Sequence, residues 1–469
     1  MQQTLLGQKL LDEQVVSEEQ LEAALVRQRL HGGRLGYNLV ALGYLSQEEL
    51  GAFFRPHPPP PVTAKDTSID ITFLTDLLLK HCSVLGEFAL QDVSRRVRLP
   101  ARIVNEILDA LRHDRFLEVK GAGSYAKSTF TFAITATGQH RAAELMEICR
   151  YLGPAPVLLE EYIRMVEMQT IRNIVVDSDA LRRAFKDITL GNGLLERLGP
   201  AVSSGKAIFL YGPPGNGKTT VAETLSKALP GNVYMPHAIY VDGQIVTVFD
   251  GATHVPAPPQ MGEEEVDQRW VLVHRPVVLA GGELRLDMLE LEFNTITNFY
   301  EAPLQMKANN GMFIIDDFGR QLIEPQNLLN RWIAPLERRT DFLTLHTGLK
   351  FIIPFDQLSV FSTNINPKEL VDEAFLRRIR YKIKIDHPSQ DVYEAIFKKV
   401  CAANGIEFDQ EVFDYLLGNY YERLGVRFNA CHPRDLLDQI LDNAHYFNYP
   451  AKLTCKDIDM AWENYFVEM

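Results

Sequence analysis

The sequence has few cysteines, and no pattern among them builds a site. Its five cysteines lie far apart, with an odd total and no Cys-x-x-Cys pair. Such a set argues against a disulfide framework and a zinc ribbon, because both need closely spaced or evenly paired cysteines. We therefore expect a reducing compartment.

Long apolar runs are also missing. No stretch approaches the roughly 18 uninterrupted apolar residues that a membrane span requires. The first residues, MQQTLLGQKL, lack the basic segment followed by an apolar segment that marks a secretory signal. These two absences predict a cytoplasmic chain without a membrane span.

An excess of positive charge is the third absence. Lys and Arg number 48 against 61 Asp and Glu, which gives a formal net charge of -13. A protein of this charge repels nucleic-acid phosphates as a whole, so contact with DNA would need a local basic patch. The 46% apolar composition is ordinary for a globular protein, and a chain of 469 residues predicts roughly three or four domains.

Prolines and hydrophobic patterns divide the chain into five parts. Residues 1–57 come before the stretch RPHPPPPVTAKD, whose consecutive prolines favour extended polyproline II and predict a linker over residues 58–66. Three helical patterns and two β-rich runs in residues 67–150 follow the order of a winged helix. After the break YLGPAP, residues 151–388 predict an α/β core with a buried parallel sheet, and residues 389–469 predict an all-α lid.

The stretch GPPGNGKT fits the phosphate-binding pattern G-x-x-x-x-G-K-[ST], and it lies between the apolar strand AIFLY and a helix. Its glycines let backbone N–H groups turn toward phosphate oxygens, and the helix N-terminus adds positive dipole character. We expect Lys218 to reach the β and γ phosphates and Thr219 to ligate Mg²⁺. The candidate ATP-binding residues of this stretch are Gly212, Pro213, Pro214, Gly215, Asn216, Gly217, Lys218, Thr219 and Thr220.

Two carboxylates, Asp316 and Asp317, follow the apolar strand GMFII. We expect Asp316 to hold the Mg²⁺ ion and Asp317 to orient or polarise the attacking water. Two acids at a strand end can also cap the next helix, but their combination with a phosphate-binding loop favours catalysis.

From about Leu158 to Met469, these motifs resemble the AAA+ ATPases. FSTNINP looks like sensor 1, which implies that Asn364 lies near the γ-phosphate. AFLRRIRYKIKI is similar to the arginine-finger segment, with Arg378 the best match and Arg377 the next. CHPRDLLDQI looks like the sensor 2 helix and implies that Arg434 contacts the nucleotide. The resemblance further implies ATP hydrolysis, a homo-oligomer in the form of a hexameric ring, and a protein client.

The chain departs from the AAA+ pattern in two places. AAA+ enzymes usually carry Glu where this chain has Asp317, which is one methylene shorter, so we expect slow hydrolysis or a nucleotide-dependent switch. The region between Lys218 and Asp316 is also long, and it holds a predicted hairpin around Asp242-Gly243. The stretch RTDFLTLHTGLKFIIPF alternates like a second hairpin. Such insertions resemble the MoxR and chelatase side of the superfamily, with decoration of a sheet edge as the alternative.

The first fifty residues nearly repeat themselves. LLGQKLLDEQVVSEEQL aligns without a gap with RLGYNLVALGYLSQEEL, 29 positions later. Each copy predicts a short helix, a turn and a second helix, and two copies can bury apolar faces that one copy cannot. A four-helix adaptor is therefore one interpretation.

The repeat also resembles the MshEN type of domain on type II secretion and type IV pilus ATPases, whose tandem RLG-x-x-L motifs bind cyclic di-GMP. An arginine can bond a guanine edge while leucines pack on its faces. The second copy keeps this arginine as Arg34, whereas the first copy has Leu5 there. The resemblance leaves binding of cyclic di-GMP open. Its candidate residues are Arg34, Leu35, Gly36, Gln28, Leu6 and Gly7.

The predicted winged helix would place its third helix, ARIVNEILDALRHDR, in a DNA major groove if it read DNA. Residues 67–150 carry eleven Lys and Arg against ten Asp and Glu, which is far from a basic stripe. We favour protein contact or domain spacing over DNA, with Arg95, Arg96 and Arg98 as the residues to watch.

These expectations describe a cytoplasmic bacterial AAA+ ATPase that uses ATP and Mg²⁺ to remodel a protein partner, with regulatory N-terminal domains and a link to pilus or secretion machinery. The alternative is a nucleotide-switched regulator that associates with DNA through its winged helix.

Overall fold

A five-stranded parallel sheet lies at the centre of the structure, a computed structural model that describes residues 7, 10–11, 15–32, 35–46, 50, 58–122, 130–174, 176–191, 193–258, 266–370 and 373–466. Its strands, in spatial order, are β10 (Val277–Ala280), β13 (Met312–Ile315), β16 (Leu358–Thr363), β5 (Ile208–Tyr211) and β17 (Tyr381–Lys384). Every residue of β13 and β16 is buried, which is why both were predicted from continuous apolar runs. The prediction of a parallel α/β core is confirmed.

The order of the strands marks where a ligand can bind. The first strand in sequence, β5, lies between the fourth and the fifth, so the chain changes direction across the sheet beside β5. In open α/β sheets, ligands bind outside the carboxyl ends of the strands at such a point. The loop that carries GPPGNGKT leaves this end of β5.

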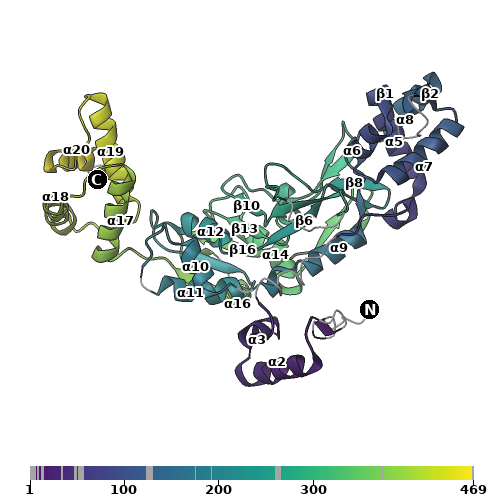
Figure 1. Cartoon of the computed structure of the whole chain (residues 1–469). Helices are drawn as coiled ribbons and strands as arrows, with labels where there is room; N and C mark the ends of the chain where they lie inside the picture. The colour runs from purple at the N-terminus through teal and green to yellow at the C-terminus, as the bar shows by residue number, and fades with distance from the viewer. Residues whose placement is uncertain are drawn as a thin grey trace.

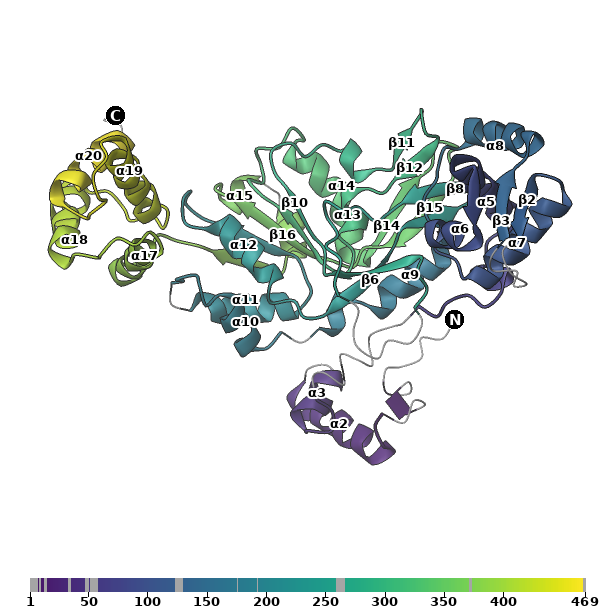
Figure 2. The ribbon, with the colours of Figure 1, turned by 45° about the horizontal axis from the view of Figure 1, so that its top comes forward.

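Helices cover both faces of the parallel sheet (Figure 2). One face packs against α10 (Ser178–Ala184), α11 (Leu194–Ser203) and α12 (Lys218–Ser226). The other face packs against α14 (Pro325–Arg338) and α16 (Glu373–Arg378). On that second face the rings of Phe209 and Phe361 stack, and Trp332 is completely buried. Both faces of the sheet are therefore covered by apolar residues, and only the ends of its strands are left for polar groups.

A second group of strands lies beside the parallel sheet. One five-stranded sheet has the order β11-β12-β8-β7-β4, and a further pair joins β6 to β9. Their bounds are β4 (Val157–Leu158), β6 (Asn232–Pro236), β7 (Ala238–Val241), β8 (Gln244–Thr247), β9 (Trp270–His274), β11 (Glu292–Asn294) and β12 (Phe299–Glu301). The predicted hairpin is β7-β8, and its turn residues Asp242 and Gly243 both have positive φ, 48° and 80°, as a tight Asp-Gly turn requires.

The second predicted hairpin is also present. It pairs β14 (Thr340–Thr344) with β15 (Lys350–Pro354), and their buried residues join the core of the second sheet together with α9 (Leu159–Met168). Both insertions are thus structural parts of one layer rather than isolated loops.

Residues 67–150 form three helices, a three-stranded antiparallel sheet and a further helix. The elements are α5 (Ile71–Leu85), β1 (Glu87–Ala89), α6 (Leu90–Val97), α7 (Ala101–His113), β2 (Leu117–Ala122), β3 (Phe130–Ile134) and α8 (Ala136–Ile148). The predicted helices and strand pair are present. The short strand β1 was not predicted, because three residues carry too little alternation.

This region packs against the second sheet (Figure 1). The rings of Phe73 and Tyr240 lie 4.7 Å apart, and the Arg150 N–H donates to the Thr297 carbonyl at 2.8 Å. The linker is attached as well, because the Pro58 carbonyl accepts a hydrogen bond from the Asp267 N–H at 2.9 Å.

The C-terminal region is a helical domain with its own core. Its helices are α17 (Gln390–Ala403), α18 (Gln410–Leu416), α19 (His432–Tyr446) and α20 (Cys455–Tyr465), with a π-helical turn η5 (Leu417–Glu422) after α18. The four predicted helices are therefore found, and residues 390–466 contain no strand. No sequence pattern predicts the π-helical turn, which spans only six residues. No helix in the described part of the chain is long and apolar enough to cross a membrane.

The doubled stretch at the N-terminus is a repeat in three dimensions too. Its described helices are α2 (Glu18–His31) and α3 (Leu35–Ala41). Leu10 and Leu39, which align 29 positions apart, are both completely buried in one core. The Val15 N–H donates to the Leu10 carbonyl at 2.9 Å, and the Tyr44 N–H donates to the Leu39 carbonyl at 3.0 Å. The described residues of the two copies therefore share one core and one matching backbone hydrogen bond.

One buried carboxylate joins distant parts of the α/β region. Asp356 is 3% exposed and lies two residues before β16. It accepts hydrogen bonds from the Thr170 hydroxyl at 2.8 Å, the Ile171 N–H at 2.8 Å and the Asn310 amide at 2.9 Å. The carboxylate thus fixes the segment after α9 and the segment before β13 to the start of β16.

Asp356→Ala should destabilise the chain by about 3–5 kcal/mol, because three buried donors would lose a charged acceptor. Asp179→Ala is the matched control, since the Asp179 side chain is 74% exposed and pairs only loosely with Arg182, at 4.0 Å; it should change stability by less than about 0.5 kcal/mol. Chemical unfolding followed by circular dichroism measures both. Equal midpoints for the two variants would contradict the role given to Asp356.

Candidate nucleotide site

The loop GPPGNGKT connects β5 to α12 and needs glycine for steric reasons. Gly212, Gly215 and Gly217 all have positive φ, at 146°, 75° and 78°. A Cβ atom at Gly212 would lie 1.9 Å from the Ile385 carbonyl oxygen, and one at Gly215 would lie 2.6 Å from the Cys431 sulfur. The loop can therefore wrap at the N-terminus of α12 only without side chains at these positions.

Lys218 begins α12 and is buried, with 6% of its surface exposed. Its Nζ donates a hydrogen bond to the Pro213 carbonyl at 2.8 Å, so the side chain lies across the loop. Burial lowers the pKa of Lys218, while the charges of Asp316 and Asp317 act in the opposite direction. The ammonium group therefore lies close enough to both carboxylates to interact with them electrostatically.

Thr219 and Asp316, the two residues expected to hold Mg²⁺, lie next to each other. The Thr219 hydroxyl donates to Asp316 Oδ2 at 2.7 Å, and the Asp316 N–H donates to the Ala280 carbonyl on β10 at 2.9 Å. A hydroxyl and a carboxylate are ligands that suit Mg²⁺, which is held in proteins by one or two carboxylates together with substrate phosphates. In the described ranges no group of three His, Cys, Asp or Glu residues could hold a metal. This pair thus fits Mg²⁺ when phosphate oxygens complete the shell.

Asp317 and Asn364 also lie together. Asn364 Nδ2 donates to Asp317 Oδ1 at 3.2 Å, which links the ends of β13 and β16. Asp317 has a φ of 48° and is exposed, and the next residue, Phe318, donates its N–H to the Ser362 carbonyl at 2.7 Å. The backbone after β13 is therefore attached to β16 and directs the Asp317 carboxylate toward solvent beside the phosphate loop.

Gln321 supports these carboxylates, and sequence patterns did not reveal it. Its Nε2 donates to the Asp316 carbonyl at 2.7 Å, and its Oε1 accepts from the Gly319 N–H at 2.8 Å. One side chain thus closes the loop that carries both acids. No motif marks such a glutamine, so only the fold identifies it.

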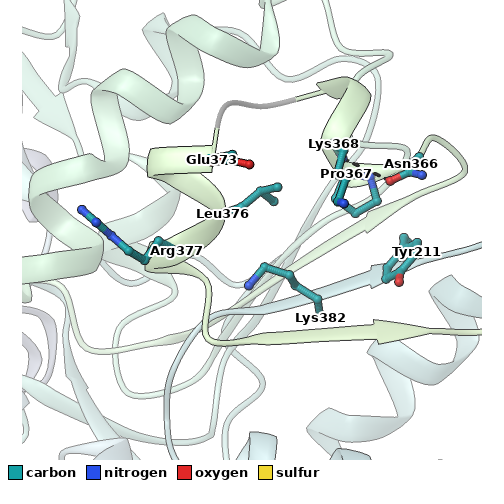
Figure 3. A pocket seen from close by; sticks show the side chains of 8 residues that line it. All are labelled: Tyr211, Asn366, Pro367, Lys368, Glu373, Leu376, Arg377 and Lys382. Atoms are coloured by element: carbon teal, nitrogen blue, oxygen red, sulfur yellow. Dashed lines mark hydrogen bonds between the residues drawn. The ribbon is translucent and has the colours of Figure 1, made fainter.

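The three predicted arginines lie on other elements. Arg378, in α16, forms an ion pair with Glu337 of α14, with 2.6 Å between Arg378 Nε and the carboxylate. Arg377 lines a cavity of about 600 Å³ together with Tyr211 and Lys382, and Figure 3 shows it extending away from Tyr211. Arg434, in the first turn of α19, has a 70% exposed side chain, and its Nε lies 3.6 Å from Asp435.

The C-terminal helical domain contacts the phosphate loop through residues that no motif predicted. The Cys431 N–H donates to the Gly215 carbonyl at 2.9 Å, and the Ala430 N–H donates to Asn216 Oδ1 at 3.0 Å. Asn216 Nδ2 in turn faces Asn429 Oδ1 at 3.3 Å. The segment just before α19 therefore lies directly against the loop.

A second cavity, of about 350 Å³, lies where these two parts meet. Its walls include Leu190 and Val221 from the α/β region, Val392 from α17, and the polar side chains of Asn216 and His387. The volume is near the lower end for small-molecule pockets, which typically measure about 300–1,000 Å³. A cavity beside a phosphate-binding loop that combines apolar and polar walls can hold an aromatic base. Its walls come from separate segments, so sequence patterns did not predict it.

The candidates in the N-terminal repeat have a structural use. A Cβ at Gly36 would lie 3.0 Å from the Leu50 side chain, and one at Gly7 would lie 3.1 Å from Leu21. Both glycines are buried, so each permits close packing within its own copy. Of the remaining candidates, Leu35 and Gln28 are described, whereas Leu6 and Arg34 lie outside the described residues.

The arginines of the region 67–150 do not form a basic stripe. Arg95 lies 3.5 Å from Asp92, and Arg98 ends α6 in the left-handed conformation. On α7, Arg102 pairs with Glu106 at 3.7 Å and Arg112 pairs with Asp109 at 3.3 Å. Mixed charges on α7 argue against its use as a DNA-reading helix.

Comparison with known proteins gives one family model and distant solved structures. Residues 389–464 match a family described as a domain of unknown function (DUF8689). No curated protein matches the chain.

Solved structures that match part of the chain include a RuvB mutant from Thermotoga maritima, with 12% identity and a TM-score of 0.33, over 63% of this chain and 72% of that one. Domain III of the replication initiation protein DnaA from Thermotoga maritima has 13% identity and a TM-score of 0.35, over 61% of this chain and 97% of that one. Identities and scores of this size assign no activity.

Gly215→Ala should loosen the contact between the loop and the helical domain, because the new Cβ would overlap the Cys431 sulfur. Gly231→Ala is the matched control: Gly231 has a φ of 81°, and a Cβ at this position would meet no atom within 4 Å, so both variants carry about 1–2 kcal/mol of left-handed strain. Hydrogen exchange at the Cys431 amide should accelerate only in Gly215→Ala. The same acceleration in both variants would refute the steric argument.

Proposed function

We propose that the chain is an AAA+ ATPase that binds Mg²⁺ and ATP at the loop GPPGNGKT and hydrolyses the nucleotide. The observation that carries this proposal is the convergence of Lys218, the Thr219–Asp316 pair and the Asp317–Asn364 pair. They gather at the carboxyl ends of three neighbouring parallel strands and at the N-terminus of α12. Helix N-termini bind phosphate, and carboxylates next to the phosphates bind the cation.

Each residue has a distinct role in this proposal. Lys218 exchanges its bond to Pro213 for the β and γ phosphates, while Thr219 and Asp316 hold the cation, which neutralises phosphate charge. Asp317 orients the attacking water, and Asn364 fixes the Asp317 carboxylate. The adenine base occupies the cavity of about 350 Å³ between Val221 and Val392, where apolar contacts suit an aromatic ring.

The finer AAA+ features are also proposals. In a hexameric ring, Arg378 would act on the nucleotide of the neighbouring subunit, and that nucleotide would compete with Glu337 for the guanidinium group. Arg377 is the second candidate for this role. Arg434 would have to move from its exposed position to touch a nucleotide.

The output that fits best is remodelling of a protein partner. The second sheet and its two hairpins enlarge the α/β region, as in the MoxR and chelatase proteins that the sequence resembles. Residues 67–150, read as a winged helix, contact protein or space the domains, because the arginines near α7 are paired with acids. DNA association is the alternative, and it would require a basic surface on this region.

Lys218→Ala should abolish ATP binding, because it removes the positive charge at the phosphates, and Asp317→Asn should keep binding but lose most turnover. Calorimetric titration and phosphate release measure the two effects. Lys227→Ala is the control, since Lys227 is exposed at the other end of α12. Turnover by Asp317→Asn at the wild-type rate would remove Asp317 from the reaction.

For the N-terminal repeat we propose an adaptor that holds other proteins, because Gly7 and Gly36 serve packing within each copy. Sensing of cyclic di-GMP, and with it a link to pilus or secretion machinery, is the competing role.

If the N-terminal repeat senses cyclic di-GMP, two substitutions should change the affinity of the full chain for it. Arg34→Ala should lose cyclic di-GMP binding and Leu5→Arg should strengthen it, each by about ten- to a hundredfold, the effect of one charged hydrogen bond. Titration calorimetry of the wild type and both variants decides the matter. If neither substitution changes the affinity, the sensing role is contradicted and the adaptor role is the one that stands.

A further inference from the structure

A chain of hydrogen bonds runs from the phosphate loop into the core of the helical domain. Asn216 Nδ2 faces Asn429 Oδ1 at 3.3 Å, and Asn429 Nδ2 lies 3.2 Å from His432 Nε2. His432 Nδ1 lies 2.9 Å from the Tyr421 hydroxyl, which lies 2.7 Å from the Tyr393 hydroxyl. Five side chains thus connect the loop to α17, η5 and α19.

Each bond in this chain determines the direction of the next one. The Ala430 N–H donates to Asn216 Oδ1, so Asn216 Nδ2 must donate to Asn429 Oδ1. Asn429 Oδ1 also lies 2.8 Å from His387 Nδ1, which can donate to it. The Asn429 amide nitrogen therefore faces His432 Nε2, which must accept, and the His432 proton lies on Nδ1.

His432 fits this assignment because it is buried and uncharged. Burial lowers the pKa of His432 to about 4, with Asp435 acting to raise it and His387 acting to lower it. Tyr421 on η5 and Tyr465 on α20 are the other titratable groups against the ring. The neutral imidazole that the hydrogen bonds require is therefore the form present near neutral pH.

The link lies at the border of the proposed nucleotide site. Asn216 belongs to the phosphate loop, and both Asn216 and Ala430 line the cavity of about 350 Å³. Asn429 and His432 belong to the region 389–464, which matches the domain of unknown function. Movement of that region away from the loop would break the Asn216–Asn429 bond, since a hydrogen bond is lost within about an ångström.

We propose that Asn429 is a positioning residue that holds Asn216, and with it the phosphate loop, in the wrapped conformation that binds the nucleotide. The region 389–464 thereby couples its own position to occupation of the site through Asn429 and His432. This role rests on the proposed function, because it assumes that a nucleotide binds the loop. It differs from the expected role of Arg434, whose exposed side chain makes no such link to Asn216.

The first test removes the link. Asn429→Ala should weaken ATP binding about five- to twentyfold, the size of an ordinary coupling between sites. ATP should also protect the backbone amides of α19 from hydrogen exchange in the wild type and much less in the variant. Asn404→Ala is the matched control, because Asn404 is exposed in the same domain and its side chain bonds only the Val400 carbonyl four residues earlier.

The second test keeps the volume and removes the hydrogen bonds. Leucine is close to asparagine in size, but it offers no donor or acceptor to Asn216 or His432. Asn429→Leu should therefore weaken ATP binding, and reduce the ATP-dependent protection of α19, as Asn429→Ala does. Wild-type affinity in Asn429→Leu would contradict the positioning role.

The outcomes separate the two proposals. If the wild type binds no ATP, the proposed function fails and this role fails with it. If the wild type and Asn404→Ala bind ATP, Lys218→Ala does not, and Asn429→Ala binds as the wild type does, the nucleotide site stands and the positioning role is refuted. Circular dichroism establishes that each variant is folded, and Asn429→Leu decides the question if Asn429→Ala does not fold.

Discussion

The hydrogen bond between Thr219 and Asp316 is the contact on which the rest of the site depends. It joins the first turn of α12 to the end of β13, two elements that are 97 residues apart in sequence. The contact is possible because β5 and β13 run parallel and end at the same edge of the sheet, with the buried strand β16 between them. A parallel sheet needs apolar cover on both faces, so polar groups can gather only at its ends. The same constraint brings Asp317 to Asn364 and leaves the loop next to both carboxylates.

The parts of the site that the sequence predicts are those that follow directly from a strand or precede a helix. Lys218 and Asp316 could be placed because a buried strand fixes where its next residue emerges, whatever lies between the strands. The cavity wall at Leu190 and Val392, and the support by Gln321, could not be placed, because they depend on how separate segments meet in space. The fold follows the same rule. Long apolar strands and helices with apolar periodicity were predicted, whereas the three-residue strand β1 and the π-helical turn η5 carry too few residues to show a pattern.

The N-terminal repeat shows how one sequence pattern supports two interpretations. Alignment at a constant spacing predicts a repeated fold, and the matching hydrogen bonds at Leu10 and Leu39 agree with it. The glycine in each copy is a motif residue for a ligand and also a packing residue for Leu21 or Leu50. Packing is sufficient to explain the glycine, so only the arginine can discriminate between the two. A charged residue, which an apolar core does not need, is therefore the informative position in such a motif.

The same reasoning applies to the helical domain, where an exposed arginine and a buried amide chain are both candidates for communication with the nucleotide. Arg434 carries a long side chain and a net charge, so it can follow a phosphate over several ångströms and its attraction falls slowly with distance. Asn429 carries no charge, and its bonds to Asn216 and His432 have fixed directions. A small displacement breaks a directional hydrogen bond between neutral groups, whereas it changes the energy of a charge–charge interaction only slightly. The amide hydrogen bonds therefore form only when the helical domain contacts the loop. An arginine, by contrast, can attract the domain toward a bound phosphate from a greater distance.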